Sequence, residues 1–178
     1  RLHKVSEHFV AEARKVGGSM MRIYKDTRFS KDKTPYKTNV GIQFRHEQGK
    51  DVHAPGFYVH FEPGDVFLGV GIWHPESEAL AKIRTYMDEH QSAWKKATND
   101  KAFKKQFELA GDSLKRPPKG YDKEHPLIDD LKRKDFIAVT NMDEATLLSQ
   151  HFIDEVDQAF QRSSGFMQLL CKAMGLPF

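Results

Sequence analysis

Apolar and polar residues alternate along four short segments in the first half of the chain, and this alternation predicts β-strands. Successive side chains of a strand point to opposite faces of a sheet, so each segment has one apolar and one polar side. A fifth strand is expected in the second half. The predicted strands cover residues 20–24, 39–45, 57–62, 66–73 and 136–140. Pro63, Gly64 and Asp65 form a tight-turn sequence, which predicts that the third and fourth strands are a hairpin.

Elsewhere apolar residues recur every three or four positions, which is the spacing of one face of a helix. This pattern predicts helices at residues 2–16, from Pro75 onward, at about 100–110, near 125–133 and, with a break at Gly165, through the C-terminal region. Strands therefore come early and helices late. We predict an α+β fold in which residues 1–178 form one domain, with a largely antiparallel sheet of about five strands and helices packed on one face.

The strand alternation separates a core set of side chains from a second, mixed set on the opposite face of the sheet. The core set includes Met21 and Ile23. In the second set, glycines lie among aromatic, cationic and acid–base side chains. Its members are Arg22, Tyr24, Gly41, Gln43, Arg45, Tyr58, His60, Glu62, Phe67, Gly69, Gly71 and Trp73. Three interpretations of this polar face stay open. It is the hydrated side of the sheet, or its glycines make room for a packed helix or loop, or it is the floor of a binding or catalytic cleft.

Charge is concentrated in one segment of a nearly balanced chain. Lys and Arg number 28 and Asp and Glu number 25 among the 178 residues, whereas residues 22–37 hold six Lys or Arg and only two Asp. We call this segment the basic loop. The distribution excludes a strongly cationic protein that coats polyanions and favours one local anion site. Alternatively, Asp26 and Asp32 pair with neighbouring cations and only hold the loop in place.

We expect the basic loop and the polar face to form one site, because the loop leaves the first predicted strand directly after Arg22. Its ligand would be a small molecule that carries phosphate or carboxylate. The predicted ligand-binding residues are Arg22, Asp26, Arg28, Lys33, Tyr36, Lys37, Gln43, Arg45 and Trp73. Tyr58, His60 and Glu62 would orient the ligand or move a proton, so that the protein is either a binder or an acid–base enzyme.

His60 and Glu62 would complete a set of two histidines and one carboxylate if His74 joined them, which is a known arrangement for iron. The sequence gives no reason for these three residues to converge. We therefore predict an ordinary hydrogen-bonded histidine and no metal site. The sequence identifies no cofactor and does not specify an oligomeric state.

Two other classes of function stay open. Phe29 and Tyr36 in the basic loop are suited to stacking on bases, which makes weak nucleic-acid binding an alternative. A protein-interaction or structural module without catalysis is a further alternative. Cys171 is the only cysteine, which excludes an intramolecular disulfide and indicates a reducing compartment such as the cytoplasm. No apolar stretch reaches the ~20 residues of a membrane helix, so no membrane partner is expected.

Several segments resemble the signature of one family. They are residues 22–37, 55–58, 62–64, 69–71, 74–75 and 114–121, of which the basic loop, with Arg22-Ile23-Tyr24-Lys25-Asp26-Thr27-Arg28-Phe29, is the longest. Together they resemble the domain of unknown function 2461 family over almost the whole chain. Its members usually begin with an additional Asn-rich segment that contains an Arg-Glu-Trp-Phe-like stretch. The resemblance therefore implies that an N-terminal segment is missing here, and it implies no activity, cofactor or catalytic residue.

Overall fold

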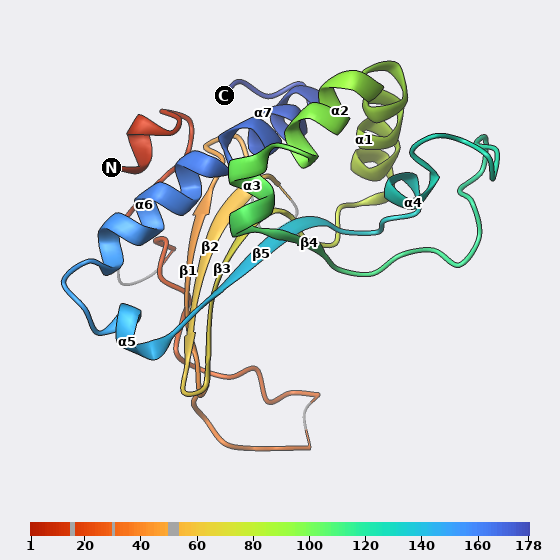
Figure 1. Ribbon diagram of the computed structural model, residues 1–178. Coiled ribbons are helices and arrows are strands. Elements are labelled where there is room, and N and C mark those ends of the chain that lie inside the picture. The colour runs from red at the N-terminus through yellow and green to blue at the C-terminus, as the bar shows by residue number, and fades with distance from the viewer. Residues whose placement is uncertain (15–16, 30, 50–53) are drawn as a thin grey trace.

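A five-stranded antiparallel sheet forms the centre of the computed structural model, which describes residues 1–14, 17–29, 31–49 and 54–178 (Figure 1). The order of the strands across the sheet is β1-β2-β3-β5-β4, and every neighbouring pair is antiparallel. The strands are β1 (Val40–Arg45), β2 (Gly56–Glu62), β3 (Asp65–Ile72), β4 (Glu108–Ala110) and β5 (Phe136–Met142). This confirms the predicted α+β class with an antiparallel sheet.

Apart from one short 3₁₀ turn near the N-terminus, the described helices all come after β3 in the chain. The helical elements are the 3₁₀ turn Leu2–Lys4, α1 (Ser77–Glu89), α2 (Gln91–Thr98), α3 (Lys101–Gln106), α4 (Ile128–Leu131), α5 (Glu144–Leu147), α6 (Phe152–Arg162) and α7 (Ser164–Ala173). Asp100 fixes the start of α3, since its carboxylate accepts hydrogen bonds from the backbone N–H groups of Ala102 and Phe103. Among the described residues, no helix is long and apolar enough to cross a membrane.

Helices α6 and α7 cover the apolar face of the sheet (Figure 1). The ring of Phe57 on β2 lies 4.6 Å from that of Phe160 on α6, measured between centroids, and Phe61 lies 5.6 Å from Phe152. From α7, Phe166 is almost completely buried in the same core. Burial of each such side chain contributes roughly 1.5–3 kcal/mol to folding, so this face is the main source of stability.

The fifth strand is not the predicted one. Residues 20–24 make only isolated bridges, Met20 with Ile42 and Tyr24 with Tyr36, and β4 takes the fifth place at the other edge of the sheet. Because Met20 lies opposite Ile42, the alternation along this segment is shifted by one residue from the predicted one.

The assignment of Met21 and Ile23 to the core was therefore wrong. Met21 lies against Gly41 on the polar face, where its backbone N–H donates to the Gly41 carbonyl at 2.8 Å. Ile23 is half exposed. A one-residue shift in register moves every side chain of a strand to the other face, which accounts for both corrections.

The described part of the N-terminal segment is mostly without regular structure, where the apolar spacing predicted a helix. Only Leu2–Lys4 form a short 3₁₀ turn, and residues 15–16 of the predicted helix lie outside the described residues. Phe9 instead pairs with His46, and the Val10 N–H donates to the Arg45 carbonyl at 2.9 Å. The Phe9 side chain is completely buried in the core, so tertiary contacts override local helix propensity here.

Two other predicted helices are shorter than expected. The helix predicted at about 100–110 ends at Gln106, because Phe107 is extended and the following three residues pair with β5 as β4. Of the helix predicted near 125–133, only α4 is helical.

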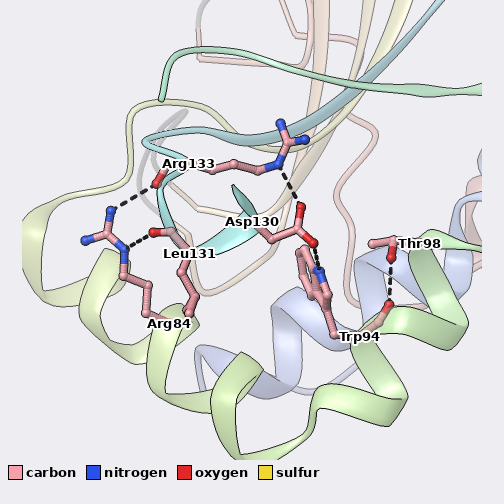
Figure 2. Close-up of polar contacts among 6 residues, drawn as sticks. All are labelled: Arg84, Trp94, Thr98, Asp130, Leu131 and Arg133. Atoms are coloured by element: carbon pink, nitrogen blue, oxygen red, sulfur yellow. Dashed lines mark hydrogen bonds and ion pairs between the residues drawn. The ribbon is translucent and has the colours of Figure 1, made fainter. Parts of the chain in front are cut away.

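A polar network attaches α4 to helices α1 and α2 (Figure 2). Arg84 of α1 donates to the carbonyl oxygens of Leu131 and Arg133 at 2.8 and 3.0 Å. Asp130 accepts from the Trp94 indole at 2.8 Å and from the Arg133 guanidinium at 3.1 Å. These bonds satisfy carbonyls at the end of α4, directly before β5 begins.

Candidate functional site

A cavity of about 420 Å³ lies on the polar face of the sheet. The strand register assembles it: Tyr58 of β2 lies opposite Gln43 of β1 and Gly69 of β3, and His60 lies opposite Phe67. All five of these residues line the cavity. The alternation therefore places Gln43, Tyr58 and His60 around one hollow, whereas the predicted Arg45 and Glu62 do not line it.

Glycines form the floor of the cavity. Gly56, Gly69 and Gly71 all line it, and Gly56 lies directly opposite Gly71 in the ladder between β2 and β3. A Cβ atom built on Gly71 would lie only 2.0 Å from the carbonyl oxygen of Phe136, so the backbones of β3 and β5 approach too closely there for a side chain. Gly69 differs, because a Cβ there would meet only Tyr58, at 3.7 Å. The floor is low because these positions carry no side chains.

The walls of the cavity are mainly apolar. Met21, Phe67 and Trp73 come from different parts of the chain, and Ile137 and Val139 of β5 close the far side. Trp73, which the sequence predicted as a ligand-binding residue, directly follows β3 and is half exposed.

Tyr58, His60 and Glu62 follow one another on the same face of β2, and the first two line the cavity. The Tyr58 hydroxyl and His60 Nδ1 are hydrogen-bonded at 3.0 Å, and His60 Nε2 lies 3.6 Å from Glu62 Oε2. The imidazole also stacks on Phe67, with ring centroids 4.5 Å apart and planes 14° apart. Burial raises the pKa of Tyr58 above its ordinary value, so its phenol stays protonated.

The basic loop is partly self-paired. Arg28 contacts Asp26 through Nε at 3.0 Å and Nη2 at 2.7 Å. Lys25 pairs with Asp32. These hydrogen bonds lower the pKa of the Asp26 carboxyl and, with help from Thr34, bring that of Asp32 to about 2. These contacts agree with the alternative that Asp26 and Asp32 pair with neighbouring cations and hold the loop in place.

The predicted basic-loop residues do not line the cavity. Figure 1 shows residues 23–29 and 31–38 projecting past the turn between β2 and β3. Lys33 donates to the Thr27 carbonyl at 2.8 Å, and the ring of Tyr36 lies 5.6 Å from that of Tyr24. Thr38, which directly follows the loop, donates a hydrogen bond to Glu62 at the end of β2.

Besides Lys33, three predicted cations make no ion pair with any described carboxylate. Arg22 and Lys37 are exposed, and Arg45 is partly buried at the end of β1, opposite Gly56. None of these three appears among the ion pairs of the described chain, although the Arg22 charge contributes to lowering the pKa of Asp26. Arg45 shares the cavity face of β1 with Gln43 and lies opposite Gly56, whereas the one-residue shift at residues 20–24 turns Arg22 to the other face, where the sequence had not placed it.

His74 does not join His60 and Glu62. It follows β3 at the opposite end of that strand from Phe67, the residue on which His60 stacks. Its Nδ1 lies 2.9 Å from the Asp135 carboxylate, which also accepts the His74 backbone N–H at 2.8 Å. This partnership supports the unusual positive φ of +47° at His74.

Asp65 was missed by the sequence reasoning. Glu62 and Asp65 are paired across the two-residue turn of the hairpin, and His60 lies two residues before Glu62 on the same face. The donor atoms of these three side chains lie within 4.8 Å of one another. The turn sequence at Pro63 and Gly64 already implied that Glu62 pairs with Asp65, so this cluster could have been predicted from the sequence.

Fold and cavity together define an α+β protein with a candidate small-molecule site on an antiparallel sheet. The chain belongs to the family described as Conserved hypothetical protein (DUF2461), whose model matches residues 1–169. This confirms the resemblance carried by the basic loop and the shorter motifs. No curated protein matches the chain.

Proposed function

We propose that the protein binds a small organic anion whose apolar body lies in the glycine-floored cavity. The observation that carries this proposal is the cavity itself, with a volume of about 420 Å³. Ligand sites typically measure roughly 300–1,000 Å³ and combine apolar walls with a few polar groups. Here Gln43, Tyr58 and His60 are the polar groups.

The shape of the cavity favours a planar ligand body. Gly69 and Gly71 leave a floor without side chains, and Phe67 and Trp73 offer aromatic surfaces beside it. Tyr58 would donate a hydrogen bond to the ligand, because burial keeps its phenol protonated. A flat ring with one polar substituent would therefore contact both kinds of surface.

The anionic group would be held by a cation near the rim. Arg45 is the candidate, because it lies two residues after Gln43 on the same face of β1 and opposite Gly56 of the cavity floor. Arginine binds phosphate or carboxylate with two parallel hydrogen bonds, which gives direction as well as charge. An acid–base role for Tyr58, His60 and Glu62 stays a prediction that depends on finding a reaction.

Thermal unfolding with chosen probes tests the proposal, since a ligand of the native state raises Tm. The probes are phenyl phosphate, benzoate, inorganic phosphate and a single-stranded oligonucleotide. Phenyl phosphate should raise Tm more than inorganic phosphate does. Gly69→Leu, which places a side chain in the cavity, and Arg45→Ala should each reduce this shift, whereas Lys104→Ala on α3 should not.

Equal shifts with phenyl phosphate and inorganic phosphate would contradict a role for the cavity. Binding only of the oligonucleotide, weakening steeply with salt, would instead favour the nucleic-acid alternative. No shift with any probe would favour an interaction module.

A further inference from the structure

We propose that His60, Glu62 and Asp65 bind one divalent transition-metal ion at the end of the β2–β3 hairpin. The three residues come from adjacent strands, and their donor atoms lie within 4.8 Å of one another. The site concerns metal binding alone and does not depend on the organic anion proposed above.

The spacing of the first two donors suits a shared ion. His60 Nε2 and Glu62 Oε2 are 3.6 Å apart, which is too long for a hydrogen bond. Two metal–ligand bonds of about 2.0–2.2 Å at a tetrahedral angle separate their donor atoms by about 3.4 Å. A change of a few tenths of an ångström would thus let both atoms contact the same ion.

The imidazole of His60 is prepared as a ligand. Its Nε2 atom is buried and has no hydrogen-bond partner among the described residues. Its other nitrogen, Nδ1, is hydrogen-bonded to the Tyr58 hydroxyl, and stacking on Phe67 fixes the plane of the ring. Metal-binding histidines commonly have such a partner on the second nitrogen, because it sets the tautomer and the orientation of the ring.

The carboxylates are also positioned by the fold. Thr38 donates a hydrogen bond to Oε1 of Glu62, which leaves Oε2 facing His60. Glu144 accepts the Gly64 N–H at 2.6 Å and so anchors the turn that carries Asp65. Asp65 itself is exposed and would close the site from the solvent side.

The donor types indicate the class of metal. One imidazole and two carboxylates suit Zn²⁺, Mn²⁺ or Fe²⁺ better than Ca²⁺ or Mg²⁺, which prefer oxygen ligands alone. Two carboxylates would neutralise a divalent ion. Three protein ligands would leave a coordination position open, as catalytic zinc sites do. Since His60 also lines the cavity, this position would lie beside it.

Calorimetric titration of the metal-free, untagged chain with ZnCl₂ tests the site, without any organic ligand present. The wild-type chain should bind one Zn²⁺, and Co²⁺ should give a visible d–d absorption band. His60→Ala, Glu62→Gln and Asp65→Asn should each weaken the binding at least tenfold. Tyr58→Phe should weaken it about 10–100-fold, as loss of a partner of a metal ligand typically does.

His125→Ala is the matched control. His125 is similarly buried, with 15% of its side chain exposed against 12% for His60, and it also faces a carboxylate, that of Asp88 at 2.9 Å. This variant should bind Zn²⁺ as the wild type does. Circular dichroism of each apo variant checks folding, and Glu62→Gln and Asp65→Asn alter only polar groups. Absence of Zn²⁺ binding by the wild type, or unchanged binding by folded Glu62→Gln and Asp65→Asn, would overturn the proposal.

Discussion

Replacing Gly71 by alanine should destabilise the protein strongly, although it adds only one methyl group. Gly71 has φ +122°, a conformation that residues with a side chain rarely adopt, and its added Cβ would lie 2.0 Å from the Phe136 carbonyl oxygen. The methyl group cannot rotate away from this contact, because it is attached directly to the backbone. The ladder between β3 and β5 must therefore shift.

The size of the effect follows from two contributions. A strained backbone conformation costs roughly 1–3 kcal/mol, and an overpacked contact typically costs about 1–3 kcal/mol. We therefore expect Gly71→Ala to lower the free energy of unfolding by about 4 kcal/mol, the sum of the two middle values. For a chain of this length, about 2–4 °C of Tm corresponds to 1 kcal/mol, so Tm should fall by roughly 8–16 °C.

Gly69→Ala is the control, because Gly69 lies two residues away on the same strand and the same cavity floor. Its Cβ would meet Tyr58 at 3.7 Å, which is an ordinary contact, and its backbone lies outside the positive-φ region. We expect its free energy of unfolding to stay within about 1 kcal/mol of the wild-type value. Urea unfolding followed by circular dichroism measures both variants. Equal stability of the two would refute the steric argument at Gly71.

Three further predictions concern separate parts of the chain. The Asp32 carboxyl should titrate near pH 2 when followed by NMR, and its pKa should return toward 3.8 in Lys25→Ala. Its contribution to stability is present above the unfolded pKa and is lost as the pH falls toward 2. An unchanged Asp32 pKa in Lys25→Ala would disprove the pairing. Cys171 should resist iodoacetamide at pH 8 in the folded chain, because burial raises the pKa of its thiol to about 12; rapid modification without unfolding would contradict this. Trp94→Phe should lower the free energy of unfolding by roughly 1.5–3 kcal/mol in urea, because the hydrogen bond to the charged Asp130 is lost; no change would mean that the bond contributes nothing.

The predictable part of the site is the part built by one hairpin. A two-residue turn and clear alternation fix the register of β2 and β3, so Tyr58, His60 and Gly69 could be assigned to one face before the structure was known. The same turn brings Glu62 opposite Asp65, but the sequence reasoning considered His74 in its place. The geometry of the turn therefore identifies the neighbour of Glu62 better than a search for a second histidine does.

The parts that could not be predicted depend on contacts distant in sequence. The segment around Met21 shows the alternation of a strand, but it pairs with β1 one residue out of the predicted register. The three residues of β4 lie in a stretch where Phe103 and Phe107 have helical spacing, and only pairing with β5 makes them extended. Phe9 likewise shows helical spacing and packs in the core from a non-helical segment. Local periodicity does not determine whether these segments are helical or extended, or in which register they pair, because pairing with distant strands decides it.

The pairing of two loop segments with β1 has a consequence for how the protein meets other chains. The Val10 N–H donates to the Arg45 carbonyl, the Met21 N–H donates to the Gly41 carbonyl, and the Gln43 N–H donates to the Ser19 carbonyl. Backbone groups along the outer side of β1 are thereby occupied from within the chain. An uncovered edge strand invites a foreign strand to extend the sheet, which is a common route to aggregation. Along this side of the sheet, an approaching strand would find these donors and acceptors already engaged.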